Sequence, residues 1–152
     1  MQQLLIWTLD ERRYALPLAA VERVERAVAV TPFPAAPGIV CGIVNVQGQV
    51  VAVIDMRQRL GLPAREIALT DQIVLAHTAR RRIAFVADAV AGVVDCADDA
   101  IVGAGLIVPV PAADFASGVV KLDDGMILIH DLDRFLSLDE ELALEKALSD
   151  AY

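Results

Sequence analysis

Short apolar runs separated by charged or glycine-containing turns recur along most of the chain, and this pattern predicts strands joined by tight turns. Apolar runs at 6–9 and 14–17 flank a charged tip, which indicates a hairpin. A second hairpin is expected over 42–54, with Gln47-Gly48 at its turn. A third is expected from the runs 73–78 and 83–94. These last runs have few polar interruptions, which is typical of strands buried on both faces of a closed barrel.

Helices are expected between and after these strands. Residues 18–27 carry apolar side chains at 20, 21, 24 and 27 with charges between them, a spacing that predicts a short amphipathic helix. Asp55 and Asp131 each precede a short helical stretch, and as N-caps their carboxylates would accept hydrogen bonds from first-turn amides. Ser137 and Glu140 form a capping box that opens a terminal helix. The glycine- and proline-containing stretch 100–111 is expected to be a connector.

The segment 42–56 is repeated 76 residues later as 118–132. In this alignment Gly42 falls on Gly118 and Asp55 falls on Asp131, and apolar residues coincide at eight further positions. The offset is half the length of the 152-residue chain. We therefore expect a mainly β architecture made of two small barrels of similar build, each with a hairpin followed by a capping helix.

Composition narrows the possible functions. A formal net charge of −8 argues against a nucleic-acid binder, because phosphate recognition requires clustered cations. The longest uncharged stretch, 100–113, is shorter than the roughly 20 apolar residues that span a bilayer. Cys41 and Cys96 have no CxxC spacing, so we expect reduced cysteines rather than a disulfide or a metal site. With no secretory signal near Met1, a cytoplasmic location is expected.

Candidate catalytic groups are few. Two related halves that each present one aspartate could bring Asp55 and Asp131 together as a dyad that shares a proton. Such a dyad would make the protein a hydrolase. Both aspartates run into bulky residues and into helix starts, which favours capping instead. His77 and His130 lie in strand-like runs without a nucleophile at a motif spacing. We therefore predict no catalytic, cofactor-binding or metal-binding residue, and a function carried out by contact with other proteins.

Several short stretches follow one another in an order that is found in one known family. They are Trp7-Thr-Leu, Tyr14-Ala-Leu-Pro, Val21-Glu-Arg-Val24, Gly42-Ile-Val-Asn-Val-Gln-Gly, Val53-Ile-Asp-Met-Arg, Phe85-Val-Ala-Asp-Ala-Val90, Ser117-Gly and Gly125-Met-Ile-Leu-Ile-His-Asp-Leu132. In this order they resemble the CheW-like coupling proteins of bacterial chemosensory arrays. The likeness covers essentially the whole chain, so residues 1–152 are expected to form a single CheW-like domain of two pseudo-symmetric barrel halves.

The resemblance implies two intertwined, five-stranded SH3-like barrels with short helices, a C-terminal helix and no catalytic activity. It also implies two partners: the regulatory domain of a CheA-type histidine kinase, and the helical tips of chemoreceptors. No direct membrane insertion and no cofactor are expected. By position, Val21, Ile73 and Val90 would line an apolar groove between the halves that accepts the receptor, and Val24 would lie beside them.

Three positions depart from the family pattern. The family usually has Glu where this chain has Arg23, Arg where it has Gln47, and Pro where it has Ala52. The first two positions are partner-binding in typical members, and a reversed or missing rim charge changes specificity. We therefore expect a divergent adaptor with altered partners. The alternatives are a small-ligand-binding or sequestering β-barrel domain, and the hydrolase described above.

Overall fold

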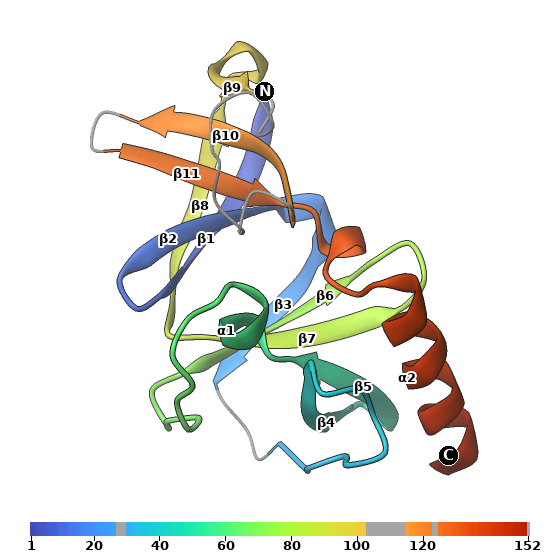
Figure 1. Cartoon of the computed structure of the whole chain (residues 1–152). Helices are drawn as coiled ribbons and strands as arrows, with labels where there is room; N and C mark the ends of the chain where they lie inside the picture. The colour runs from blue at the N-terminus through green and yellow to red at the C-terminus, as the bar shows by residue number, and fades with distance from the viewer. Residues whose placement is uncertain (27–29, 103–114, 123–124, 152) are drawn as a thin grey trace.

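The computed structural model describes residues 1–26, 30–102, 115–122 and 125–151. Its strands form two sheets, drawn one above the other in Figure 1. The first sheet has the order β8-β1-β2-β11-β10-β9 and the second has the order β3-β6-β7-β5-β4. The strands of the first are β1 (Gln2–Leu9), β2 (Arg12–Pro17), β8 (Ala89–Cys96), β9 (Ile101–Val102), β10 (Ala116–Leu122) and β11 (Gly125–His130). Those of the second are β3 (Val21–Arg26), β4 (Val40–Val46), β5 (Gln49–Ile54), β6 (Gln72–His77) and β7 (Arg82–Ala87).

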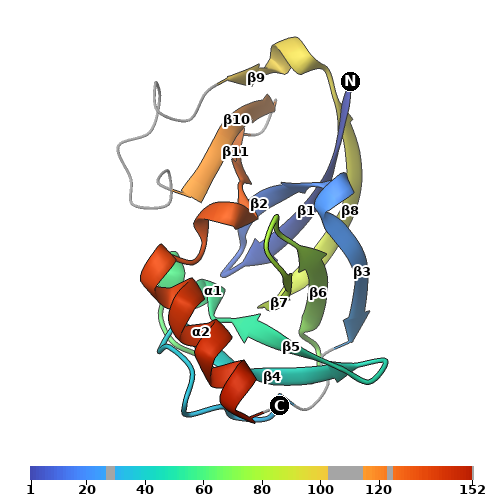
Figure 2. The ribbon, with the colours of Figure 1, turned by 90° about the vertical axis from the view of Figure 1, so that its right-hand side faces the viewer.

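The helical elements are short except for the last one. They are η1 (Leu18–Ala20), α1 (Met56–Arg59), η2 (Asp98–Ala100), η5 (Leu132–Arg134) and α2 (Leu138–Ala151). Figure 2 shows α2 running across the front of β4 and β5, and its buried Leu144 joins the central apolar cluster. The predicted capping box is confirmed, since Glu140 N donates to Ser137 Oγ at 3.1 Å and Ser137 N donates to Glu140 Oε1 at 2.8 Å.

The two sheets exchange strands. The chain enters the first sheet as the hairpin β1-β2, crosses through η1, and adds β3 to the edge of the second sheet. Later it completes the hairpin β6-β7 in the second sheet, crosses at Asp88, and adds β8 to the edge of the first. Each sheet therefore contains strands from both halves of the sequence, and the predicted intertwined, mainly β architecture is confirmed.

The internal repeat has a structural counterpart. β4-β5 and β10-β11 are equivalent hairpins, and each carries a register shift at its glycine, between Val40 and Gly42 and between Ala116 and Gly118. Each second strand then pairs in parallel with a strand of the other repeat, β5 with β7 and β11 with β2. After the hairpins, Asp55 N donates to Ile39 O and Asp131 N donates to Phe115 O, both at 2.8 Å.

Each sheet encloses its own apolar cluster. In the second sheet the cluster is Val44, Val46, Val51, Val53, Ile73, Leu75 and Ala84. In the first sheet it is Leu4, Ile6, Ala15, Cys96, Val120, Ile127 and Ile129, and several of these residues lie 76 positions after members of the other cluster. A third and larger cluster fills the space between the sheets, and we call this region the seam. The fold thus has two barrel interiors and one shared core.

The predicted helix over 18–27 is wrong. After the single turn η1 the chain becomes strand β3, which begins at Val21, and Ala27 lies outside the described residues. A register shift between Val21 and Arg23 explains the misleading pattern. One extra residue in a strand turns positions three apart to the same face, so Val21 and Val24 both face the seam although their spacing imitates a helix.

The run 83–94 is also not one strand. It divides at Asp88 into β7 and β8, which belong to different sheets. β7 is largely buried, as expected, but most of β8 is half-buried or exposed because it is an edge strand with one neighbour, β1. Of the predicted connector 100–111, Ile101 and Val102 form β9 and the remainder from 103 onward lies outside the described residues.

The two equivalent glycines lead to a prediction about stability. A Cβ on Gly42 would lie 2.5 Å from both Thr31 O and Val30 Cγ1, whereas one on Gly118 would lie 3.0 Å from Ile101 Cγ2. We expect Gly42→Ala to lower the free energy of unfolding by about 1–3 kcal/mol through overpacking, and Gly118→Ala to lower it by less. Urea denaturation measures both. Gly38→Ala, which meets nothing within 4 Å, is the control and should be nearly neutral.

Candidate functional site

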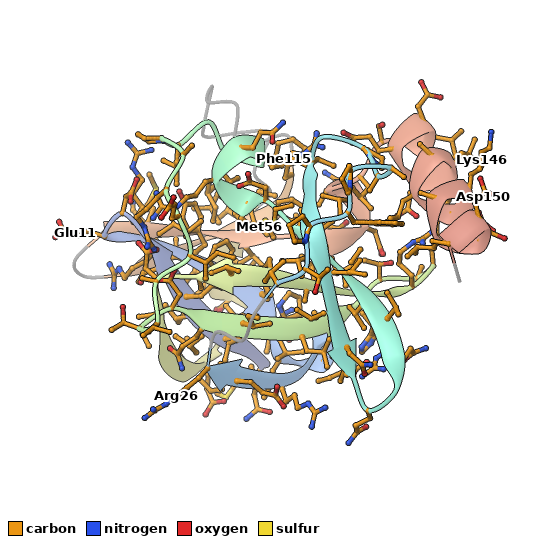
Figure 3. All side chains as sticks on the ribbon, turned by 90° about the horizontal axis from the view of Figure 1, so that it is seen from below. Glu11, Arg26, Met56, Phe115, Lys146 and Asp150 are labelled. Atoms are coloured by element: carbon orange, nitrogen blue, oxygen red, sulfur yellow. The ribbon has the colours of Figure 1, made fainter. Side chains whose placement is uncertain are left out.

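In the part of the chain that the structure describes, the seam between the sheets is a packed core and not an open groove. Its buried members come from both sheets and from the helical elements α1, η5 and α2. Trp7 stacks on Tyr14 and lies against Phe85, with centroid separations of 4.8 Å in both cases. Figure 3 shows Met56 of α1 directed into this interior, while Arg26, at the end of β3, lies at the periphery.

The two exchanged strands form the rim of this core. Val21 and Val24 of β3 are partners of Ala76 and Val74 in β6, and Val90 and Val93 of β8 are partners of Trp7 and Leu5 in β1. The partner residues all belong to the central cluster; Val21, Val24 and Val90 pack against it, and the register opposite Leu5 places Val93 on the same side of β8. We call Val21, Val24, Val90 and Val93 the seam rim. In Figure 2, β8 and β3 lie along the same edge of the molecule.

The rim is pseudo-symmetric and partly accessible. Val21 and Val90 hold equivalent places in β3 and β8, as do Val24 and Val93. Val21, Val24 and Val90 are half-buried, and Val93 is 48% exposed. The structure thus brings together three of the residues selected from the sequence and adds Val93, which sequence reasoning missed. The sequence feature that could have indicated Val93 is the run of apolar residues in β8. In an edge strand, not all of these residues can be buried.

The other selected residues are not members of the seam rim. Arg23, on β3, forms an ion pair with Glu25 two positions along the same strand, with 3.1 Å between Nε and Oε1. Gln47 is exposed at the β4-β5 turn with a positive φ of 52°. Ile73 is only 5% exposed and belongs to the interior cluster of the second sheet, where it borders a hollow of roughly 350 Å³. Ile73 is therefore not part of the seam rim.

A network of ion pairs fixes the place where the chain crosses from β7 to β8. Arg57 on α1 binds Asp10 of the β1-β2 tip at 2.8 Å and Asp88 at 2.9 Å. Arg65 binds the same Asp88 and also the buried Asp71, the latter at 2.8 Å. One carboxylate therefore ties together the first hairpin, the first helix and the segment that follows it. We call Asp88 the crossover aspartate.

Asp88 is held in its charged form. Burial alone would raise its pKa, but hydrogen bonds from Asp10 N–H and from the Arg57 and Arg65 guanidinium groups outweigh burial and hold the pKa below its usual value. Arg57 has only a tenth of its side chain exposed and depends on this partner for compensation of its charge. Sequence reasoning missed the network. Its signal was an aspartate that interrupts an otherwise apolar run.

The duplicated aspartates have the capping role that was predicted. Asp55 Oδ1 accepts from Gln58 N at 3.1 Å, and Asp131 Oδ1 accepts from Asp133 N at 3.0 Å. They line two different hollows, so they do not form a shared-proton dyad. In the parts of the chain that the structure describes, no three His, Cys, Asp or Glu side chains are grouped so that they could hold a metal ion. Within the same residues, no helix has the length and apolar character to cross a membrane.

Comparisons with known proteins agree with this geometry. The family model of the CheW-like domain matches residues 3–140. The chain is 27% identical to the chemotaxis protein CheW of Rhizobium meliloti, over 93% of this chain and 92% of that protein. It is 24% identical to CheW of Klebsiella aerogenes, over 94% and 86% respectively. The crystal structure of the scaffolding protein TtCheW from Thermoanaerobacter tengcongensis is similar, with a TM-score of 0.82, 25% identity, and 91% and 94% of the two chains covered.

Two sheets that exchange strands around a shared core are thus the architecture of this chain and of its structural relative. The family match spans nearly all of the chain, and this protein belongs to the CheW-like domain family.

The crossover aspartate gives a stability prediction. Asp88→Ala leaves the nearly buried Arg57 with Asp10 as its one described carboxylate partner, beside a hydrogen bond to Pro63 O, so we expect the free energy of unfolding to fall by on the order of 3 kcal/mol. Chemical denaturation at pH 7 measures this. Asp98→Ala is the control, because Asp98 and its partner, the Met1 amino group, are both largely exposed and such pairs contribute little. Equal effects of the two substitutions would contradict the assigned role.

His130 gives a pH prediction. Burial lowers its pKa from the ordinary 6.5 to about 4, so between these values the unfolded chain binds a proton that the native protein resists. The sign is therefore a loss of stability as pH falls below about 6.5, amounting to about 2 kcal/mol by pH 5. His130→Phe should remove this part of the pH dependence. Urea midpoints of both proteins at pH 7.5 and 5.0 test it, and parallel losses would refute it.

Proposed function

We propose that this protein is a non-catalytic adaptor in a bacterial chemosensory array, coupling a CheA-type histidine kinase to the cytoplasmic tips of chemoreceptors. The proposal rests on membership of the CheW-like family and on relatives that are named chemotaxis protein CheW or scaffolding protein. The site of action is then the cytoplasm, where kinases and receptor tips are found. One domain of two pseudo-symmetric halves, residues 1–152, carries the activity.

The seam rim is the observation that carries this function to particular residues. Its four valines are apolar, lie on two edge strands, and follow an approximate two-fold arrangement. Partly exposed aliphatic side chains next to a rigid core are suited to receive the apolar face of a helix. A receptor tip is a helical hairpin, and its two antiparallel helices can address the two equivalent halves of the rim.

Charge near the rim supports altered partner specificity. The guanidinium of Arg23 is paired with Glu25, so β3 presents a zwitterionic pair where typical members present a carboxylate. Glu22 of the same strand binds Arg82 at 2.8 Å. A partner that carries a cation for the usual glutamate meets Arg23 instead, and like charges at a rim reduce both association rate and specificity for that partner.

The rim leads to a matched pair of substitutions. Val93 and Val94 are adjacent in β8 with 48% and 38% exposure, but Val93 faces the seam and Val94, opposite Leu4, faces the interior side of the first sheet. We expect Val93→Asp to weaken binding of a receptor-tip hairpin at least about tenfold, because an apolar anchor is lost and a charge is desolvated. Val94→Asp should change affinity far less. Isothermal titration measures both, and equal losses would place the docking surface away from the rim.

The specificity hypothesis has its own test. The double substitution Arg23→Glu with Gln47→Arg should strengthen binding to the receptor tip of a typical CheW-containing array, because it restores the charges found in that family. Arg26→Glu, which changes an exposed charge at the end of β3, serves as the control. Titration of each variant with the same receptor fragment gives the comparison. No gain for the double variant over the wild type would remove the hypothesis while leaving the adaptor function intact.

A further inference from the structure

The two repeats are equivalent in fold but differ at one buried position. Ile54 ends β5, and His130, 76 residues later, ends β11. Both side chains face the seam, where Ile54 is part of the central apolar cluster and His130 lies among aromatic rings. The His130 ring is 5.0 Å from Tyr14, 5.7 Å from Trp7 and 5.2 Å from Phe135, measured between centroids.

The imidazole of His130 is fully buried in the part of the chain that the structure describes. It has 0% exposure, and neither ring nitrogen has a partner among the residues that the structure describes. The Nε1 of the neighbouring Trp7 is in the same situation. A buried polar group without a partner costs free energy that an aliphatic side chain of similar size does not. The seam is therefore less stable at His130 than at the equivalent Ile54.

The backbone shows the same difference. The parallel ladder between β5 and β7 has three pairs and ends with Ile54 opposite Phe85. The equivalent ladder between β11 and β2 has two pairs, and the described residues include no third pair between His130 and Leu16. The ladder of the strand that carries His130 therefore stops one residue pair short of its counterpart, at the buried imidazole itself.

The surroundings of the two ends differ as well. Beside Ile54, Arg57 and Arg65 clamp α1 to the crossover aspartate, and the remaining hollow is about 80 Å³. Beside His130, Asp133 stands in the place of Arg57 and accepts one hydrogen bond, from Ala79 N at 2.7 Å. The hollow on this side is about 290 Å³. Among the described residues, the Ile54 end thus has two arginines on one shared carboxylate, whereas the ion pairs that follow His130, Arg59 with Glu140 and Arg81 with Glu141, hold α2 rather than η5.

We propose that the seam is held shut at the Ile54 end and opens reversibly at the His130 end, so that the barrels are hinged rather than rigidly joined. Opening there exposes apolar rings of the central cluster, including Phe135, for as long as the two barrels are apart. The proposal concerns the protein alone and does not depend on which partner it binds.

A matched pair of amides tests this proposal. Asp55 N–H and Asp131 N–H make equivalent hydrogen bonds of 2.8 Å, to Ile39 O and Phe115 O, directly after the two positions. Their exchange with solvent deuterium in the full-length protein, read by NMR and divided by the intrinsic rates, gives a protection factor for each end. We expect the Asp131 amide to be protected about tenfold less, because local opening controls exchange. Equal protection factors would overturn the proposal.

Substitution of the histidine supplies the second arm. His130→Ile installs the side chain that the other repeat uses, and it should raise protection of the Asp131 amide about tenfold while leaving that of Asp55 within about twofold. The reciprocal Ile54→His should lower protection at Asp55. An unchanged difference between the two amides in His130→Ile would also overturn the proposal. If either variant fails to fold, the wild-type comparison decides alone.

Discussion

In each sheet an edge strand, β3 or β8, pairs with a hairpin strand of the other repeat, and this exchange is the constraint on which the rest of the structure depends. β3 cannot pair in the second sheet unless the chain leaves the first at Pro17, and β8 cannot reach the first sheet unless the chain leaves the second at Ala87. The crossings bring both sheets close enough to bury one common cluster. The same crossings put the four rim valines at the edge of that cluster. The seam rim and the shared core are therefore products of a single topological feature.

Electrostatics reinforces this topology at one point. The chain has an excess of acidic groups, yet its arginines are used where segments distant in sequence must meet. Arg57 and Arg65 meet at Asp88, Arg59 binds Glu140 at 2.7 Å, and Arg81 binds Glu141 at 2.8 Å. The last two pairs fix α2 to the α1 region and to the β6-β7 tip. Arginine suits this work because one guanidinium carries several donors, so that Arg57 binds Asp10 through Nη1 and Asp88 through Nη2.

Local features of the fold could be predicted from the sequence because each depends on a few neighbouring residues. The hairpin turn at Gln47-Gly48, the caps at Asp55 and Asp131 and the box at Ser137 all belong to this kind. Features set by distant pairing could not be predicted in this way. The spacing of Val21 and Val24 imitated a helix because a strand irregularity has the same effect on facing. The break at Asp88 was hidden because a strand that changes sheets remains apolar on both sides of the crossing.

The candidate site followed the same division. Val21, Val24 and Val90 could be selected from a family resemblance, but their common surface with Val93 became visible only when β3 and β8 were placed in different sheets. Ile73 looked similar in sequence, yet its alternation along β6 points it into a barrel interior. No spacing rule distinguishes the two faces of a strand that is buried on both. The role of Arg57 likewise depended on a partner 31 residues away.

The strand exchange also bears on how such a chain could have arisen. The first repeat supplies β1 and β2 to one sheet and β3, β4 and β5 to the other, while the second repeat makes the reverse contribution. A polypeptide of half this length would complete both sheets only as a domain-swapped homodimer. Fusion of two such genes would preserve the swap and leave each copy free to change, which would account for Ile54 in one repeat and His130 in the other.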